Sequence, residues 1–140
     1  MLRHARLSIL VLVVKLSLVT MASEANDVHF ALRLCEKGDV ERLRRLVFNV
    51  NASDEDLHTP LQVAAANNQV EAVEYLLALK ATVDQPNAAG WTPLHHACLY
   101  GHNETIEVLL RAKASVSVAN HFGATAVHVT AAGGHVSTLK

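Results

Sequence analysis

The chain has 140 residues, of which 51% are hydrophobic, 18% are charged and 4% are aromatic. That length fits one domain with a core of useful size, and the composition is too apolar for intrinsic disorder. With 12 basic and 13 acidic residues the net charge is −1, so no strong basic field draws nucleic acid onto the molecule. Two cysteines are too few for a disulfide scaffold.

Residues 1–25 form an apolar N-terminal segment whose composition differs from that of the rest of the chain. Arg3 and Arg6 precede an apolar stretch at 7–14, and small residues follow, which is the outline of a secretory signal peptide. Lys15 interrupts the apolar stretch, and the segment is short for a membrane span. A membrane anchor is therefore the least favoured of its interpretations.

A second interpretation of the same segment is a start-site extension. Residues 21–24 (Met-Ala-Ser-Glu) look like the ordinary start of a cytoplasmic protein, and residues 1–20 would then contribute nothing to the fold. We expect a cytoplasmic protein, with a secreted one as the alternative if residues 1–25 are a signal peptide. The sequons at Asn51 and Asn103 would carry glycan only in a secreted chain.

The remainder of the chain repeats itself with a period of 33 residues. The tripeptide Thr-Pro-Leu at 59–61 recurs at 92–94, and Thr-Ala-Val stands one further interval on, at 125–127. The Gly-His pair at 101–102 recurs at 134–135 in the same register. Agreement at several unrelated residue types argues against chance and indicates a stack of short structural repeats.

These residues resemble the ankyrin repeat family. The stretch from Gly90 to Cys98, with the Gly-His pair at 101–102, follows the family pattern almost letter for letter, and residues 57–65 are a looser copy. The resemblance implies an all-α solenoid of stacked helix-turn-helix units with β-turn fingers. The repeats are expected at residues 27–53, 54–86, 87–119 and, incomplete, 120–140 of the repeat region 26–140.

The Thr-Pro motif explains how the first helix of each repeat begins. Pro93 suits the first turn of a helix, where its missing N–H costs nothing, and Thr92 can cap that helix. At the end of the second helix the family usually has Gly in a left-handed conformation, whereas this chain has Lys80 and Lys113. A non-glycine residue there costs about 1–2 kcal/mol, so we expect a less stable array than the family consensus.

The histidines and cysteines do not point to a metal or to catalysis. Nine His are present, but the metal-binding spacings H-x-x-x-H, H-E-x-x-H and C-x-x-C do not occur, and we expect no metal and no cofactor. The resemblance implies that His95 and His128 hydrogen-bond within their own repeats. Cys35 and Cys98 fall two repeats apart, too far for a disulfide. Without a G-x-S-x-G or phosphate-binding loop, we do not expect an enzyme.

Recognition of a protein partner is the function that the resemblance implies, because ankyrin repeats present a concave face made of finger tips and first helices. The residues expected to bind on this face are Trp91, Leu99, Tyr100, His121, Phe122, Glu55, Asp56 and His58. Trp and Tyr are enriched in the hot spots of protein interfaces. The alternative for Trp91 and Phe122 is that they only pack against neighbouring turns.

The sequence thus predicts a non-catalytic adaptor or scaffold module that binds a protein partner through its concave face. Nucleic acid, a small-molecule substrate and a membrane are not expected ligands. Two alternatives stay open: a secreted ankyrin protein that binds an extracellular target, and the regulatory ankyrin segment of a longer enzyme or channel. The fold does not name the partner, because unrelated functions share it.

Two narrower resemblances add expectations. Residues 32–39 and 121–125 are similar to the N-terminal repeats of proteins that combine ankyrin repeats with a SAM domain, some of which are scaffolds at cilia. Asn51 stands where many ankyrin repeats carry an Asn that an oxygen-dependent hydroxylase modifies. The equivalent residues of the next two repeats are Asp84 and Ser117, so Asn51 is the only Asn offered at this position.

Overall fold

The computed structural model describes residues 28–135 and residue 138, so the three interpretations of segment 1–25 concern residues outside the described part. Within the described part the regular elements are helices and there is no β-strand, which confirms the predicted all-α fold. Residues 28–37 are helical. The helices that follow in chain order are α2 (Val40–Arg45), α3 (Pro60–Ala66), α4 (Val70–Ala78), α5 (Pro93–Leu99), α6 (Asn103–Arg111) and α7 (Ala126–Ala132).

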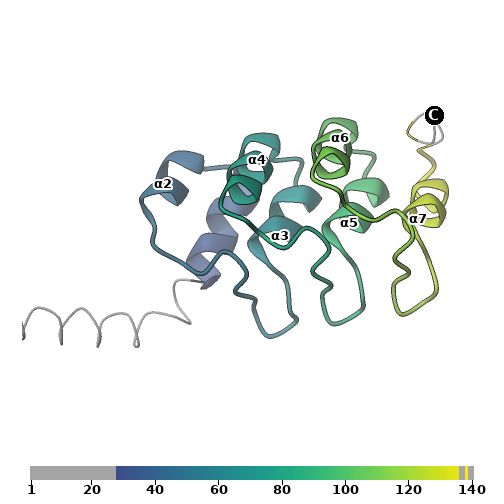
Figure 1. Cartoon of the computed structure of the whole chain (residues 1–140), viewed down its shortest axis with the longest axis horizontal. Coiled ribbons are helices and arrows are strands. Elements are labelled where there is room, and N and C mark those ends of the chain that lie inside the picture. The colour runs from purple at the N-terminus through teal and green to yellow at the C-terminus, as the bar shows by residue number, and fades with distance from the viewer. Residues whose placement is uncertain (1–27, 136–137, 139–140) are drawn as a thin grey trace, which may run out of the picture.

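The helices stand in two rows (Figure 1). One row holds the first helices of the repeats, in which α5 packs between α3 and α7, and the other holds the second helices, in which α4 packs against α6. Each first helix also packs against the second helix of its own repeat, α3 against α4 and α5 against α6. Extended fingers lead into α3, α5 and α7 and project from the same edge of the stack. This arrangement is the predicted helix-turn-helix solenoid.

The first helices begin as the Thr-Pro motif predicts. The hydroxyl of Thr92 accepts a hydrogen bond from the backbone N–H of His95, and the His95 ring accepts one from the N–H of Thr92. Pro93 lies in the first turn of α5. The ring of His128 accepts from the N–H of Thr125 in the same way, one repeat later. The predicted hydrogen bonds of both histidines within their own repeats are therefore confirmed.

Equivalent apolar residues of successive repeats form one continuous core. Leu43 and Val73 in the second helices are fully buried, and Ile106 at the equivalent position of α6 is 8% exposed. In the first helices Ala64 and Ala97 are fully buried, and their small side chains let neighbouring repeats approach closely. Because each of these faces is covered by the next repeat, the stack and not the single repeat is the folding unit.

The second helices end in the left-handed backbone conformation that the sequence predicts. Lys80 follows α4 with φ 69°, and Lys113 follows α6 with φ 70°. A further non-glycine residue with positive φ is Leu57, at 62°, which stands at a finger position occupied by Gly90 in the next repeat. Each such residue carries a backbone strain that glycine would not.

Candidate functional site

Each finger is closed by an Asp or Asn side chain at its base. The Oδ1 atom of Asn87 accepts hydrogen bonds from the backbone N–H groups of Ala89 and Trp91, both at 3.0 Å. Asp54 and Asn120, 33 residues away on either side, form the same pair of bonds in their own fingers. Such Asx turns fix the backbone of a loop. Their 33-residue spacing is the sequence signal that could have identified these three residues.

Neighbouring fingers are also joined to each other. The N–H of Ala88 donates to the carbonyl oxygen of Asp56, and the N–H of His121 donates to that of Ala89, each at 3.0 Å. The ring of His121 lies over Gly90, because a Cβ added to that glycine would come within 2.7 Å of the ring. His121, which was predicted to bind a partner, thus packs one finger against the preceding one.

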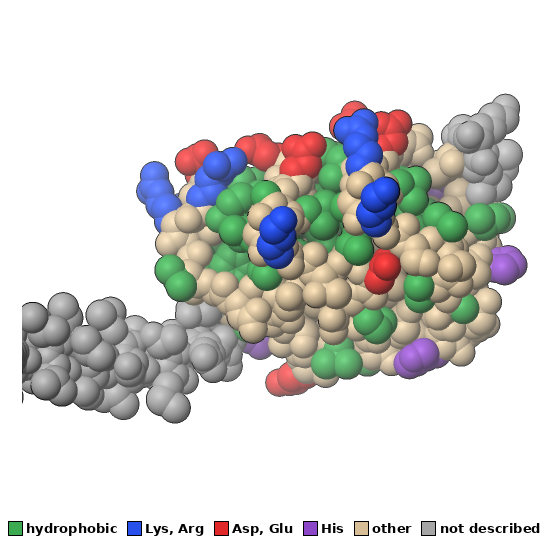
Figure 2. Space-filling view, viewed as in Figure 1, with side chains coloured by type: hydrophobic (Ala, Val, Ile, Leu, Met, Phe, Trp, Pro, Cys, Tyr) green, Lys and Arg blue, Asp and Glu red, His purple; other side chains and the backbone are tan. Residues whose placement is uncertain are grey.

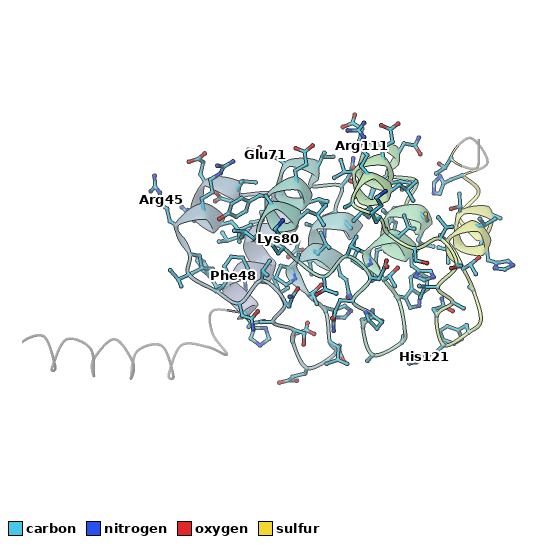
Figure 3. All side chains as sticks on the ribbon, in the orientation of Figure 1. Arg45, Phe48, Glu71, Lys80, Arg111 and His121 are labelled. Atoms are coloured by element: carbon cyan, nitrogen blue, oxygen red, sulfur yellow. The ribbon has the colours of Figure 1, made fainter. Side chains whose placement is uncertain are left out.

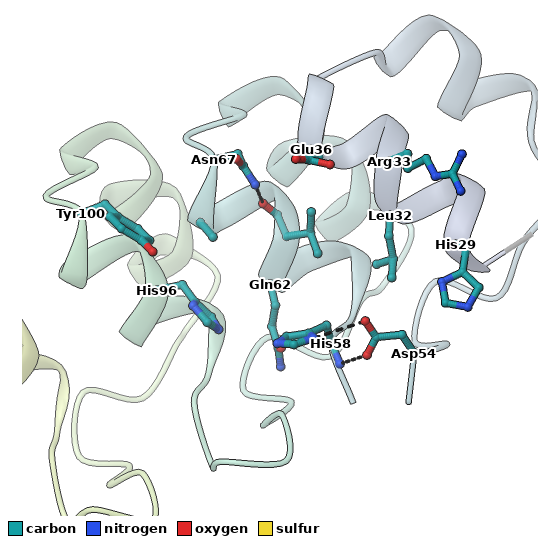
Figure 4. Close-up of a pocket in the computed structure, with 12 residues that line it drawn as sticks. His29, Leu32, Arg33, Glu36, Asp54, His58, Gln62, Asn67, His96 and Tyr100 are labelled. Atoms are coloured by element: carbon teal, nitrogen blue, oxygen red, sulfur yellow. Dashed lines mark hydrogen bonds and ion pairs between the residues drawn. The ribbon is translucent and has the colours of Figure 1, made fainter. Parts of the chain in front are cut away.

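A cavity of about 450 Å³ opens between the first helices of three successive repeats (Figure 4). Helix 28–37 forms one wall, α3 the floor and α5 the other wall. The polar residues that line it are His29, Arg33, Glu36, Asp54, His58, Gln62, Asn67, His96 and Tyr100. Gln62 and His96 were not predicted as site residues. The alignment of the first helices at 33-residue intervals is the sequence signal that could have identified them.

A second cavity of about 230 Å³ adjoins the first and is more apolar. Trp91 and Leu99 line it, together with His96 and Tyr100, which also line the larger cavity. The Trp91 ring centroid lies 5.5 Å from that of His96 and 5.9 Å from that of His95. Trp91 therefore packs within its own repeat and also faces the second cavity. We call the two cavities together the concave groove.

The concave groove brings four of the predicted binding residues together: His58, Trp91, Leu99 and Tyr100. The other four lie in the fingers, where they line neither cavity: Glu55, Asp56, His121 and Phe122. Phe122 is 82% exposed, whereas Tyr100 is 54% exposed and forms part of the groove wall. The groove is thus built from first helices more than from finger tips.

The protonation states of Asp54 and His96 contribute to the charge in the groove. A ring nitrogen of His58 lies 3.2 Å from Oδ2 of Asp54. Burial alone would raise the pKa of Asp54, but hydrogen bonds from His58, the charge of its ring and the N–H of Asp56 bring the pKa below its usual value. Burial lowers the pKa of His96 to about 4, and the nearby His58 and His95 add to the effect. At neutral pH Asp54 is therefore a carboxylate and His96 is uncharged.

The two cysteines and Asn51, which the sequence also singled out, lie outside the groove. Cys35 and Cys98 are free and buried, and burial raises the pKa of the Cys35 thiol to about 12. Asn51 is exposed, and its Oδ1 accepts a hydrogen bond from the N–H of Thr82 at 2.8 Å. Over residues 28–135 and 138, no group of three or more His, Cys, Asp or Glu side chains could hold a metal ion.

The described helices were also compared with the length of a membrane span. None of them is both long and apolar enough to cross a bilayer. Helices α4 and α6, for example, have nine residues each, whereas a span needs about 20.

Comparison with known proteins gives a consistent result. Residues 28–120 match the family model of ankyrin repeats, as three copies. The chain is 37% identical over 80 residues to Ankyrin repeat domain-containing proteins 13C-A and 13C-B of Xenopus laevis, and 36% identical to protein 13C of Xenopus tropicalis. Each match covers 55% of this chain but only 16% of the relative. These matches do not address the similarity to proteins with a SAM domain, which stays a prediction.

Proposed function

The chain belongs to the ankyrin repeat family, and from this premise we propose that it is a non-catalytic adaptor or scaffold that binds a protein partner through its concave groove. Ankyrin repeats are protein–protein interaction modules, and stacked repeats of this kind bind along extended concave surfaces. The observation that carries the proposal is the pair of adjoining cavities on this face, with His96 and Tyr100 in the wall of both.

The side chains of the groove support binding of a protein segment. Trp91, Leu99 and Tyr100 supply apolar area, and His58, Gln62 and His96 supply polar atoms. A buried aromatic anchor contributes about 2 kcal/mol or more to a protein interface, which is about thirtyfold in affinity. The opposite surface, over α4 and α6, carries Lys, Arg, Asp and Glu side chains (Figure 2), and charged residues of this kind are depleted in interface cores.

Site-specific photo-crosslinking tests this proposal. A photoreactive amino acid at position 100 samples the groove, and one at position 74, an exposed residue of α4, samples the opposite surface. We expect protein adducts in cells from position 100 and not from position 74. The double change Trp91→Ala with Tyr100→Ala should then weaken binding of the identified protein at least thirtyfold, whereas Glu74→Ala with Glu107→Ala should not change it.

Two results would contradict the proposal. Adducts that form only from position 74 would place the interface on the second helices. An unchanged affinity after the double aromatic change, with the helical circular dichroism preserved, would show that the groove is not the interface.

The proposal places the module in the cytoplasm, in agreement with a start near Met21. Intact-mass and N-terminal analysis of the protein from its own cells tests this. A chain that begins near Ser23 or Asn26 and carries glycan at Asn51 would instead be a secreted protein.

A further inference from the structure

The carboxylate of Asp54 has a charge that its role in the finger does not need. Its Oδ1 accepts the N–H groups of Asp56 and His58 at 3.0 and 2.9 Å. In the next two fingers the amide oxygens of Asn87 and Asn120 accept the equivalent pair of bonds at 2.9–3.0 Å. A neutral amide is sufficient for this turn, so the negative charge of Asp54 serves other contacts. Its Oδ2 lies 3.2 Å from Nδ1 of His58, and a carboxylate can accept further hydrogen bonds.

This carboxylate faces the larger cavity beside a polar atom that has no partner. Gln62 is 1% exposed, and its Nε2 donates to the carbonyl oxygen of Gln85 in the next finger. Its Oε1 is buried without a hydrogen-bond partner among the described residues, as is Nε2 of His96. Both residues line the cavity together with Asp54 (Figure 4). An amide oxygen can only accept a hydrogen bond, so Oε1 of Gln62 lacks a donor among the described residues.

The cationic side chains of the same repeats lie elsewhere. Between residues 51 and 135 the Lys and Arg residues are Lys80, Arg111 and Lys113, and all three lie at or just beyond the ends of the second helices. Figure 3 shows Lys80 and Arg111 well away from the finger that carries His121. The fingers and first helices of these repeats carry acidic side chains, among them Asp54, and no Lys or Arg. Arg33, on helix 28–37, also lines the cavity and lies on the same side as Asp54 in Figure 4, but no ion pair joins these two side chains among the described residues.

We propose that the concave groove binds a protein segment through an arginine side chain, which donates hydrogen bonds to the Asp54 carboxylate and to Oε1 of Gln62. This inference rests on the proposed function and names the chemistry of the partner. The guanidinium group has several donors in a planar fork that suits more than one acceptor, whereas the lysine ammonium is a compact point charge. An apolar side chain of the same segment fits the adjoining cavity beside Trp91 and Leu99.

Selection from a phage-displayed library of random peptides tests the inference on the full chain. We expect the recovered peptides to be enriched in Arg next to an apolar residue. The variant Asp54→Asn should weaken the tightest peptide about five- to tenfold, because a charge-assisted hydrogen bond becomes a neutral one. Asp54→Asn places in this finger the residue that the next two fingers already have at positions 87 and 120. The circular dichroism should therefore not change, and Tm should fall only slightly, through the weakened contact with His58.

Two controls isolate the contact. Glu74→Gln makes the same change of charge on an exposed residue of α4 and should leave the affinity unchanged. Replacing the peptide arginine by glutamine should remove most of the effect of Asp54→Asn, because the two changes then form a coupled pair. Gln62→His installs the residue found at equivalent positions 95 and 128 and should weaken arginine peptides while it preserves the fold.

The failure of this inference and that of the proposed function give different results. Peptides that lose binding in Tyr100→Ala, but lack arginine or bind Asp54→Asn equally well, would overturn the arginine contact and leave the groove as the interface. Peptides that retain full affinity in Tyr100→Ala and shift backbone NMR signals of α4 and α6 would overturn both. A selection that recovers no binding peptide would also count against the arginine contact.

Discussion

The Nε2 atom of His95 lies 3.0 Å from the carbonyl oxygen of Ala124 in the next repeat. On the other side of the ring, Nδ1 accepts the N–H of Thr92 at 3.1 Å, so the proton of the neutral ring is on Nε2 and is donated to Ala124. One imidazole thus caps its own helix and ties it to the following finger. Gln62, at the equivalent position one repeat earlier, also donates to the next finger, from Nε2 to the carbonyl oxygen of Gln85. That acceptor is equivalent to Val118 and not to Ala124.

The first prediction concerns the hydrogen bond that His95 donates to the following repeat. His95→Ala should lower the free energy of unfolding by about 2–3 kcal/mol, because a side chain that is 1% exposed is removed and the Ala124 carbonyl loses its donor. His95→Gln should cost less than His95→Ala, because glutamine at the equivalent position 62 also donates to a carbonyl oxygen of the next finger. Urea denaturation of both variants measures the difference. Equal losses would show that the bond between repeats contributes little.

The second prediction concerns stability against pH. The pKa of His96 is about 4 in the folded chain and about 6.5 when unfolded, so between these values the unfolded chain binds more protons. Stability from this group is therefore complete above about pH 6.5 and is lost as the pH falls toward 4, by about 3 kcal/mol in total. Burial also lowers the pKa of His95, which adds in the same direction.

The variant His96→Val separates this effect from general acid denaturation. Valine occupies the equivalent positions 63 and 129, so it suits the helix. Urea denaturation between pH 4 and 7 should show a shallower dependence on pH than in the wild type, with the remainder due to His95 and other groups. An unchanged pH slope would mean that His96 titrates normally in the folded chain.

The third prediction uses the strained helix ends. Lys80→Gly and Lys113→Gly should each raise stability by about 0.5–1 kcal/mol, because the left-handed strain of about 1–2 kcal/mol exceeds the entropy cost of glycine. The matched controls are the preceding residues, Leu79 and Ala112, whose φ values are −79° and −81°. Thermal unfolding should show a lower Tm for glycine at either control position, and a lower Tm at position 80 or 113 would contradict the strain.

The fourth prediction concerns modification of Asn51. Its side chain is exposed, while its Oδ1 accepts the N–H of Thr82, as Asp84 accepts the N–H of Ser115 one repeat later. After coexpression with an oxygen-dependent asparaginyl hydroxylase, peptide mass spectrometry should find one added oxygen atom on Asn51. Asn51→Asp, which copies Asp84, is the matched control. An unmodified Asn51 peptide at full coverage would contradict this prediction.

The sequence by itself determined the features that depend on a single turn of chain. Thr92 and Pro93 start α5 because a hydroxyl and a missing N–H act on the first turn alone. The backbone of Lys80 and Lys113 is left-handed because each residue follows the end of a second helix, where the chain turns toward the next finger. The 33-residue period determined that such turns stack.

The tertiary structure alone decided which side chains meet. His96 and Tyr100 join Asp54 and Gln62 in one cavity because packing of α3 against α5 brings them together, and no local signal fixes that distance. Phe122 was grouped with Trp91 from the sequence, whereas the structure places it 82% exposed and outside both cavities of the groove. Contact across repeats is a property of the stack, and helical periodicity within one repeat does not encode it.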